Sequence, residues 1–524
     1  MIHSRFSFLL QFSALLAAAQ GKPNNTPLIQ WTTCSNDYSS KLPADCGTLL
    51  VPLDYTDPAS TETYALDLLR IPATVQPAKG SIVFNFGGPG EVGRSTLAAD
   101  APVFQALTGG EHDLISFDPR GTYASNMPLT CFDSEFDLQA YANAQVIPDQ
   151  DDQATLGKLW VRGALDAAAC AKKHKKNGTL IGTAFISRDI MRIAEAVDDD
   201  GLLRFWGYSY GTTLGATLVS MFPDKVDKIV LDGVQNPHQY YHAFADVEEW
   251  AQSDEVFSGI FSSCVAYPDQ CALARDNKTA AELEQSVMAL IEQFKYHPIG
   301  VGQMTLDNSF LYQTIQNSLY SIAAWQNTTK LLDMLSNGGI DESFVLSIAS
   351  QTHPTNQQSL LGLSSVYIAT EAIHCVDRAA RAGTYENFVP TMNELYETSK
   401  IMGRGDVSLS MACAQWQLEP KERYEGDFQV TPKNPVLLIG NSYDAHTPIR
   451  SARNVSAGFE GSVVLEVNGY GHSSLGLPSK CTLATTASYW VNGTLPEPGT
   501  VCQVEARPFA NITWKDVIEN ASKN

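Results

Sequence analysis

The fold is decided by one stretch of the sequence, Leu203-Arg204-Phe205-Trp206-Gly207-Tyr208-Ser209-Tyr210-Gly211-Thr212-Thr213-Leu214-Gly215. A short apolar run leads into Gly-x-Ser-x-Gly, and small residues that favour a helix follow as far as Met221. Strand, sharp turn and helix are the setting in which this motif exposes a nucleophilic serine. The turn is so tight that side chains two residues either side of Ser209 would clash, which explains the glycines. Because the bare motif often marks an ordinary turn, the prediction depends on the flanking strand and helix.

Strand-like and helix-like runs alternate on both sides of this stretch. Strands are predicted at 47–52, 64–71, 81–86, 113–117, 228–231, 435–439 and 462–467. A helix is predicted over 186–197, just before the strand that begins at Leu203. Buried apolar strands that alternate with helices indicate an α/β fold with a mostly parallel sheet.

The pattern changes between about Pro237 and Pro432, where helical periodicity dominates. Helices are predicted at 280–294, 310–325, 329–335 and 361–382. A helical block inserted between strands of one sheet indicates a lid over the site. We therefore divide the chain into a signal peptide (1–21), a first part of the core (22–236), the lid (237–432) and a second part of the core (433–524).

The first residues are typical of a secretory signal. His3 and Arg5 precede an apolar run from Phe6 to Ala19, where small residues offer a cleavage site. This run is too short, and too interrupted by polar residues, to span a bilayer comfortably. No later stretch approaches twenty uninterrupted apolar residues. We expect a soluble, secreted protein that has no membrane partner.

Composition and charge narrow the function classes. The chain of 524 residues is 44% hydrophobic and 18% charged, which fits a large folded protein. Its 57 acidic residues outnumber its 35 basic residues, for a net charge of −22 at pH 7. This excess argues against nucleic acid or anionic membranes as partners. No nucleotide, flavin or metal site is visible, so we expect no cofactor. The sequence does not reveal the oligomeric state, for which a monomer is the default.

The cysteines and glycosylation motifs also indicate an oxidising, extracellular setting. Ten cysteines, an even number, suit disulfide formation. We predict five sequential pairs: Cys34–Cys46, Cys131–Cys170, Cys264–Cys271, Cys375–Cys413 and Cys481–Cys502. Asn-x-Ser/Thr acceptor motifs for glycosylation begin at Asn24, Asn177, Asn277, Asn327, Asn454, Asn492, Asn511 and Asn520.

A serine hydroxyl needs a base, and the base needs an orienting acid. In folds with this strand–turn–helix motif, the acid and then the histidine follow the serine along the chain, each just past a strand. Asp444 follows the strand at 435–439, and His472 follows the strand at 462–467 between glycine and small residues. Active sites of open α/β sheets collect at such strand ends. We predict Ser209, Asp444 and His472 as the catalytic residues.

Other residues compete for these roles. Asp232 and Asp118 also follow strands, but position favours Asp444, and we expect Asp118 to order its own loop with Arg120. His446 lies so near Asp444 in sequence that it complicates the choice of base, and its alternative role is to line the pocket.

The tetrahedral intermediate of acyl transfer needs two backbone N–H donors. One is expected from Tyr210, directly after the nucleophile. The other is expected from Gly88 in the turn Gly87-Gly88-Pro89-Gly90, where missing side chains let the backbone approach a substrate. The alternative, a plain glycine-rich turn, is weakened by its place after a buried strand upstream of the serine.

The chain resembles secreted tripeptidyl aminopeptidases of the prolyl aminopeptidase group of α/β-hydrolases, from about Cys46 to Cys502. The motifs that carry the resemblance are Asn85-x-Gly87-Gly88-Pro89-Gly90-x-x-Gly93, Asp118-Pro119-Arg120-Gly121-Thr122, Gly207-Tyr208-Ser209-Tyr210-Gly211-Thr212, Val230-Leu231-Asp232-Gly233-Val234, Ala372-Ile373-His374-Cys375-Val376-Asp377, Tyr443-Asp444-x-x-Thr447-Pro448 and Gly471-His472. The resemblance implies an α/β-hydrolase fold and the same three catalytic residues.

The resemblance also implies that short peptides are cleaved from a free amino terminus, with lid carboxylates meeting the ammonium group. Glu371 and Asp377 are the candidates, although a charged helix face or a helix cap explains either residue equally well. Phe86, Val92 and Tyr123 depart from the family's usual residues at positions that we expect near the substrate entrance.

Three functions follow in order of preference. The first is a secreted serine exopeptidase that releases short peptides, tripeptides in particular, through an acyl-enzyme. The second is an esterase, lactonase or thioesterase with the same catalytic residues, because fold and triad do not choose the acyl donor. The third is a hydrolase-like binding protein without turnover, against which the complete set of catalytic residues argues.

Overall fold

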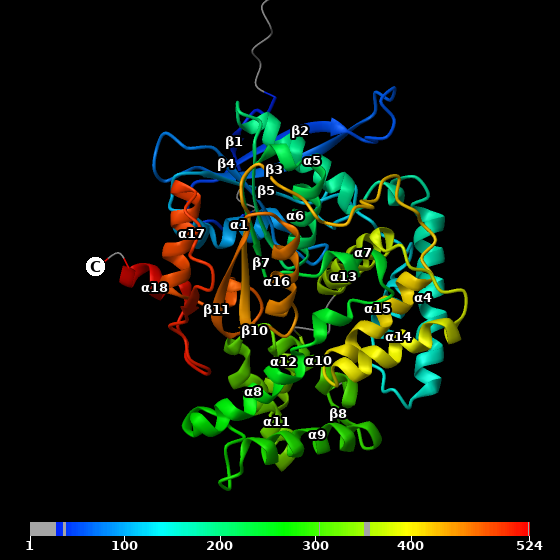
Figure 1. Ribbon diagram of the computed structural model, residues 1–524. Helices are drawn as coiled ribbons and strands as arrows, with labels where there is room; N and C mark the ends of the chain where they lie inside the picture. The colour runs from blue at the N-terminus through cyan, green and yellow to red at the C-terminus, as the bar shows by residue number, and fades with distance from the viewer. Residues whose placement is uncertain (1–27, 35–37, 303, 351–356, 522, 524) are drawn as a thin grey trace, which may run out of the picture.

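The computed structural model describes residues 28–34, 38–302, 304–350, 357–521 and 523 (Figure 1). The predicted signal peptide, residues 1–21, lies outside the described residues. In the described part of the chain, no helix is both long enough and apolar enough to cross a membrane.

A ten-stranded sheet runs through the molecule in the order β1-β2-β3-β5-β4-β6-β7-β10-β11-β12. Its strands are β1 (Thr32–Thr33), β2 (Asp45–Pro52), β3 (Thr63–Ile71), β4 (Ser81–Asn85), β5 (Asp113–Phe117), β6 (Leu203–Tyr208), β7 (Val226–Asp232), β10 (Leu437–Tyr443), β11 (Val463–Tyr470) and β12 (Val501–Gln503). The strand pairs at the N-terminal edge, as far as β3–β5, are antiparallel, and those from β5 to β12 are parallel. The mostly parallel sheet is thus confirmed.

Helices cover both faces of this sheet. They are α1 (Gly93–Ala99), α2 (Ala101–Leu107), α5 (Thr183–Val197), α6 (Tyr210–Met221), α16 (Ile449–Gly458), α17 (Lys480–Asn492) and α18 (Trp514–Ala521). Successive residues of β6 point to opposite faces: Phe205 packs in one apolar cluster, with Ile190 and Leu214, and Trp206 packs in the other, with Phe104 and Trp490. Burial on both faces explains why this strand reads as a continuous apolar run.

The remaining helices build the lid. They are α3 (Glu135–Asn143), α4 (Gln153–Lys173), α7 (Pro237–His242), α8 (Ser253–Ala266), α9 (Ala280–Tyr296), α10 (Asn308–Ser318), α11 (Trp325–Asn337), α12 (Glu342–Ala349), α13 (Gln357–Asp377), α14 (Tyr385–Thr398) and α15 (Gly403–Ala414), with a small hairpin of β8 (Ile299–Val301) and β9 (Met304–Leu306). Figure 1 shows α8 to α12, α14 and α15 gathered at the lower end of the sheet. The chain therefore has the α/β-hydrolase fold with a large helical lid inserted between core strands.

The insertion begins and ends on neighbouring strands. β7 pairs directly with β10, with Val230 opposite Leu437. α4 comes from outside the insertion, yet its Leu156 and Leu159 pack in one cluster with Phe388 and Met411 of the lid. The helices that pack together as the lid therefore include α4, which lies outside the predicted lid range 237–432 in the sequence.

Two predicted helix ranges differ from the structure. The range 310–325 is broken because Ser321 starts a short 3-10 turn, with its hydroxyl accepting from the Ala323 N–H, before α11 begins at Trp325. The range 361–382 ends early, at Asp377. All five predicted disulfides form, and among them Cys375–Cys413 ties α13 to α15.

Candidate active site

Ser209 lies at the sharp turn between β6 and α6. Its backbone has φ 54° and ψ −126°, a conformation that L-residues rarely adopt and that often marks functional turns. A Cβ on Gly207 would lie 2.1 Å from the carbonyl oxygen of Gly211, and a Cβ on Gly211 would lie 2.6 Å from that of Asn85. The predicted reason for both glycines, lack of space in the turn, is therefore correct.

Asp444 and His472 meet beside this turn. Nδ1 of His472 lies 3.1 Å from both carboxylate oxygens of Asp444. The same carboxylate accepts the backbone N–H groups of His446, Thr447 and Ser473 at 2.9–3.0 Å. Burial by itself would raise the pKa of Asp444, but the neighbouring histidines and these hydrogen bonds hold it below its usual value. Asp444 is thus held as an anion next to Nδ1 of His472.

Asp232, the main competitor of Asp444, is engaged elsewhere. Its carboxylate accepts the N–H and the hydroxyl of Ser474, at 2.8 and 2.5 Å. Burial raises the pKa of Asp232 to about 7, although both of those hydrogen bonds lower it. The carboxylate therefore ties the histidine loop to β7, and it is Asp444 that contacts the ring of His472.

Asp118, the other competitor, is paired with a cation. It forms an ion pair with Arg94, whereas Arg120 forms a buried ion pair with Asp189 at 2.6 Å. The expected pairing of Asp118 with Arg120 is therefore wrong. Both partners come from other elements, which local spacing does not reveal.

The second ring nitrogen of His472 is available for proton transfer. Nε2 is buried and has no hydrogen-bond partner among the described residues, so it is not hydrogen-bonded to Ser209 in this structure. The turn that carries Ser209 and the loop that carries His472 are nevertheless both bonded to Asp232. Its carbonyl accepts the Ser209 N–H at 3.0 Å, and its carboxylate accepts the Ser474 N–H. Such catalytic contacts often tighten only when a substrate binds.

The glycine turn after β4 lies directly against the serine. A Cβ on Gly87 would lie 2.9 Å from Cβ of Ser209 and 3.3 Å from the backbone nitrogen of Tyr210. Gly88 follows with φ +99° and lines the same cavity as Ser209. Tyr210 is the first residue of α6, so its N–H has no partner within the helix. Tyr210 directly follows Ser209, and Gly88 lines the same cavity as Ser209, so their role as oxyanion donors stays a prediction.

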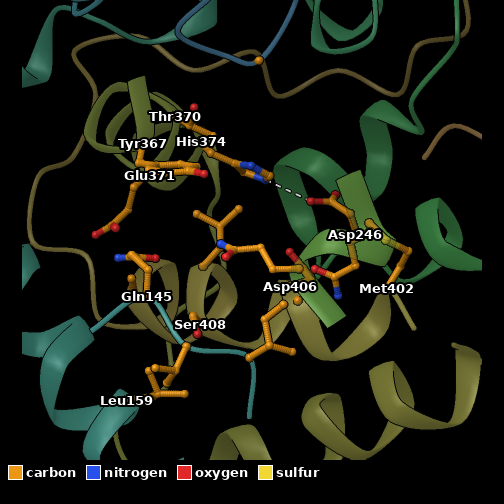
Figure 2. Close-up of a pocket in the computed structure, with 18 of the residues that line it drawn as sticks. Gln145, Leu159, Asp246, Tyr367, Thr370, Glu371, His374, Met402, Asp406 and Ser408 are labelled. Carbon is orange, nitrogen blue, oxygen red and sulfur yellow. Dashed lines mark ion pairs between the residues drawn. The ribbon is translucent and has the colours of Figure 1, made fainter. Parts of the chain in front are cut away.

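A cavity of about 350 Å³ opens beside Ser209 and extends between the lid helices. Figure 2 shows carboxylates on its walls, with Glu371 on α13 and Asp406 on α15. Its acidic lining residues are Asp166, Asp246, Glu249, Glu371 and Asp406. One cation, Arg162, also lines it, paired with Asp166 at 2.6 Å. Asp246 is likewise paired with a cation, the buried Arg378, so the acidic lining residues without an ion pair among the described residues are Glu249, Glu371 and Asp406.

Glu371 lies in this wall, as predicted from the lid motif. The hydroxyl of Tyr141 donates to it at 3.2 Å. Burial and the nearby charge of Asp166 raise the pKa of Glu371 to about 8. A carboxylate that is costly to ionise in an empty cavity gains most from a bound cation.

Asp377 does not join Glu371 in the cavity. It is fully buried and accepts the backbone N–H of Thr183 at 2.9 Å and the hydroxyl of Tyr240 at 3.1 Å. Thr183 begins α5, so Asp377 satisfies an N–H of that helix's first turn. Of the two roles considered for this residue, the structure supports the helix cap.

Sequence analysis missed four of the acidic lining residues. Glu249 accepts from Nε2 of Gln235 at 3.1 Å, and burial raises its pKa well above the usual value. Asp246 pairs with His374 at 2.9 Å, the contact dashed in Figure 2. Isolated acids in helices and turns carry no local signal of a shared cavity. Among the described residues, no group of three or more His, Cys, Asp or Glu is arranged to hold a metal ion.

His446 lines the cavity, which is the alternative role considered for it. The ring of Tyr320 stacks on it with centroids 3.6 Å apart and meets His472 edge-on at 5.4 Å. Burial and the neighbouring His472 lower the pKa of His446 to about 3, so it is neutral at physiological pH. The carbonyl of Tyr320 also accepts the backbone N–H of His472 at 2.9 Å. The lid thus touches the histidine loop directly.

The three departures from the family pattern do not line the cavity. Phe86 stacks on Tyr208 at 5.9 Å and packs in the core, and Val92 precedes α1, where its carbonyl accepts the hydroxyl of Thr96. Tyr123 is 52% exposed. The expectation that these residues lie near the substrate entrance finds no support in the cavity lining.

Comparison with known proteins agrees with this geometry. The model of a family described as TAP-like protein matches residues 399–502. The serine protease Hip1 of Mycobacterium tuberculosis is 27% identical over 505 residues, covering 93% of each chain. The tripeptidyl aminopeptidase of Streptomyces lividans is 26% identical, covering 92% of this chain and 87% of its own. Carboxylesterase B of M. tuberculosis is 27% identical, covering 92% and 91%. The resemblance to tripeptidyl aminopeptidases is thus confirmed.

Proposed function

We propose that this chain, a serine hydrolase of the α/β-hydrolase fold related to the TAP-like proteins, is a secreted exopeptidase. It releases short peptides, tripeptides in particular, from free amino termini. A peptide substrate follows from the names of two relatives, a serine protease and a tripeptidyl aminopeptidase.

The proposed reaction runs through an acyl-enzyme. Oγ of Ser209 attacks the scissile carbonyl while Nε2 of His472 takes its proton. His472 then protonates the leaving amine, and water releases the acyl group by the reverse sequence. Asp444, 3.1 Å from Nδ1, holds the imidazole tautomer and stabilises the imidazolium. The N–H groups of Gly88 and Tyr210 stabilise the oxyanion: Tyr210 directly follows Ser209, and Gly88 lines the same cavity.

One observation carries the exopeptidase proposal: two acidic residues that line the cavity beginning at Ser209 accept hydrogen bonds from neutral groups. Glu371 is hydrogen-bonded by Tyr141, and Glu249 by Gln235. Neither has a cation within ion-pair distance among the described residues. The ammonium group of a free amino terminus supplies that charge. A cavity of about 350 Å³ under a lid admits a few residues and no folded chain.

Secretion is supported by the cysteines. All ten form disulfides, which persist in oxidising compartments. The predicted signal peptide and the eight glycosylation motifs agree with this location. Treatment of the protein from its native secretory host with an N-glycosidase should lower its apparent mass, and N-terminal sequencing should begin near residue 22.

The decisive experiment is hydrolysis of a matched pair of reporters. One is a tripeptide amide with a free amino terminus, and the other is the same compound acetylated. We expect cleavage of the free form only, with release of the intact tripeptide. Ser209→Ala should lower the rate by about 10⁴-fold or more and abolish labelling by a fluorophosphonate. A Ser209→Ala protein with near-normal turnover would end the proposal.

A second candidate, an esterase or lactonase, is favoured by the relative named carboxylesterase B. The same catalytic residues would act on a small acyl ester. Cleavage of neither peptide reporter, with Ser209 still labelled by the fluorophosphonate and p-nitrophenyl acetate hydrolysed, would select this candidate over the exopeptidase.

A further inference from the structure

The lid helix α13 lies on the glycine turn expected to stabilise the oxyanion. The hydroxyl of Thr370 donates to the backbone carbonyl of Pro89 in that turn. A Cβ on Gly90 would lie 3.1 Å from Cβ of Ala369 and 3.2 Å from the backbone nitrogen of Thr370. The backbone of the turn therefore packs directly against α13, and a side chain at position 90 would crowd this contact.

The turn has little else to fix its conformation. Gly87, Gly88 and Gly90 all have φ near +100°, a conformation that glycine adopts readily and other residues rarely do. Within the turn, the N–H of Gly87 donates to the Asn85 side chain at 3.1 Å, and the N–H of Glu91 reaches the Gly87 carbonyl at a long 3.4 Å. The Gly88 N–H belongs to the peptide between Gly87 and Gly88, and of these two bonds only the long one to Glu91 reaches that peptide. An oxyanion donor, in contrast, must be held within a few tenths of an ångström.

We propose that Thr370 is a positioning residue: its hydroxyl fixes Pro89 so that the Gly88 N–H points to the site of the oxyanion. Thr370 lines the cavity but needs no contact with a reacting atom. The inference rests on acyl transfer at Ser209, the chemical part of the proposed function, and it holds for an ester as well as for a peptide.

The same hydroxyl has a second acceptor. It lies 3.0 Å from the carbonyl of Val366, four residues earlier in α13. Such a bond to the preceding turn is common for a helical threonine and affects only its own helix. The hydroxyl has one proton and can donate it to only one of these two carbonyls at a time. If it donates to Pro89, loss of the hydroxyl should lower turnover, whereas if it donates to Val366, turnover should not change.

The test replaces the hydroxyl and keeps the shape. Thr370→Val removes the donor, and Thr370→Ser keeps it. We expect Thr370→Val to lower kcat about tenfold, with KM within about twofold, for the tripeptide reporter and for p-nitrophenyl acetate. The inhibition constant of benzeneboronic acid, which forms a tetrahedral adduct on a serine Oγ, should rise by the same factor. Thr370→Ser should stay within about twofold of the native enzyme in all three measurements.

Thr328→Val is the matched control. Thr328 lies in the lid helix α11, and its hydroxyl bonds only the carbonyl four residues earlier, at 3.1 Å. This change should leave kcat unchanged. Thermal unfolding checks that each variant is folded, and Thr370→Ala against Thr370→Ser gives the same contrast if the valine variant does not fold.

Several results would overturn the inference: an unchanged kcat in Thr370→Val, a rise in KM alone, or an equal loss in Thr370→Ser. A native enzyme that hydrolyses only the ester would refute the exopeptidase proposal instead. In that case the ester and the boronic acid still decide the role of Thr370.

Discussion

The three proposed catalytic residues and the acidic cavity differ in how the fold holds them. Ser209, Asp444 and His472 each follow a strand of one sheet, so a short segment of regular structure fixes each of them. The acids of the cavity come from α4, α13, α15 and the turns after α7, which meet only when the lid packs. The first group is built locally, and the second depends on tertiary packing.

This difference implies that one region carries out acyl transfer and the other selects the substrate. Changes at the strand ends should affect every acyl substrate, because they change the reacting atoms. Changes in the cavity should affect only substrates with a free amino terminus. Each prediction below tests whether the two regions can be separated in this way.

The largest expected effect distinguishes two buried aspartates at strand ends. Asp444→Asn should lower kcat by about 10⁴-fold on peptide and ester alike, because the amide favours the wrong tautomer of His472. Asp232→Asn is the matched control. Since the pKa of Asp232 is about 7, the amide resembles its protonated form, and kcat should fall by less than about tenfold. Similar losses in both variants, measured on folded protein, would contradict the assignment of the acid.

The next effect belongs to the cavity. Glu371→Gln should raise KM for the free tripeptide reporter about 10- to 100-fold, because a charged partner of the ammonium is lost. Glu249→Gln is the companion variant, and the larger loss identifies the carboxylate that meets the amino terminus. Hydrolysis of p-nitrophenyl acetate should be unchanged in both. Equal losses on the ester would mean that the cavity also shapes the catalytic residues.

A smaller effect appears in the pH dependence. The pKa of Glu371 is raised to about 8, so most of its carboxyl groups are protonated at pH 6 and ionise as the pH rises. Only the ionised form pairs with an ammonium, so the inhibition constant of a free tripeptide should fall about 20-fold between pH 6 and pH 8. It should rise again above pH 8, as the peptide's amino group loses its charge. In Glu371→Gln the fall below pH 8 should be absent.

The smallest effect on activity is expected at Asp377. Asp377→Asn should leave KM for the free tripeptide within about twofold, because the side chain caps α5 and does not line the cavity. It should lower the free energy of unfolding by about 1–3 kcal/mol, since a buried acceptor for Thr183 and Tyr240 is weakened. Chemical denaturation measures this loss. A rise in KM as large as that of Glu371→Gln would return Asp377 to the substrate site.

The contrast between regions also explains what the sequence predicted. Ser209 and its glycines, Asp444 and His472 stand in short motifs after apolar runs, and each strand was located to within a few residues. The core and its sheet follow from the same alternation, because burial on both faces of a parallel strand requires a continuous apolar run.

The cavity was harder to predict because closeness across the lid has no local pattern. Glu371 and Asp377 are six residues apart on α13. At 3.6 residues per turn their side chains point about 120° apart, so one cavity cannot receive both. Glu249 and Asp406 are separated by more than 150 residues, and only the packed helices bring both to the cavity.

The direct pairing of β7 with β10 has a consequence for the history and redesign of this enzyme. Val230 and Leu437 are opposite each other in two adjacent parallel strands, so the insertion leaves after the end of β7 and the chain returns along the start of that same strand, where the N–H of Lys433 donates to the carbonyl of Pro223. Such an insertion can lengthen, shorten or be exchanged for another without moving any strand that carries Ser209, Asp444 or His472. Relatives can therefore differ in the substrates that they accept while the strands that carry the proposed catalytic residues stay the same. Exchange of the whole lid is the natural way to give this hydrolase a new substrate specificity.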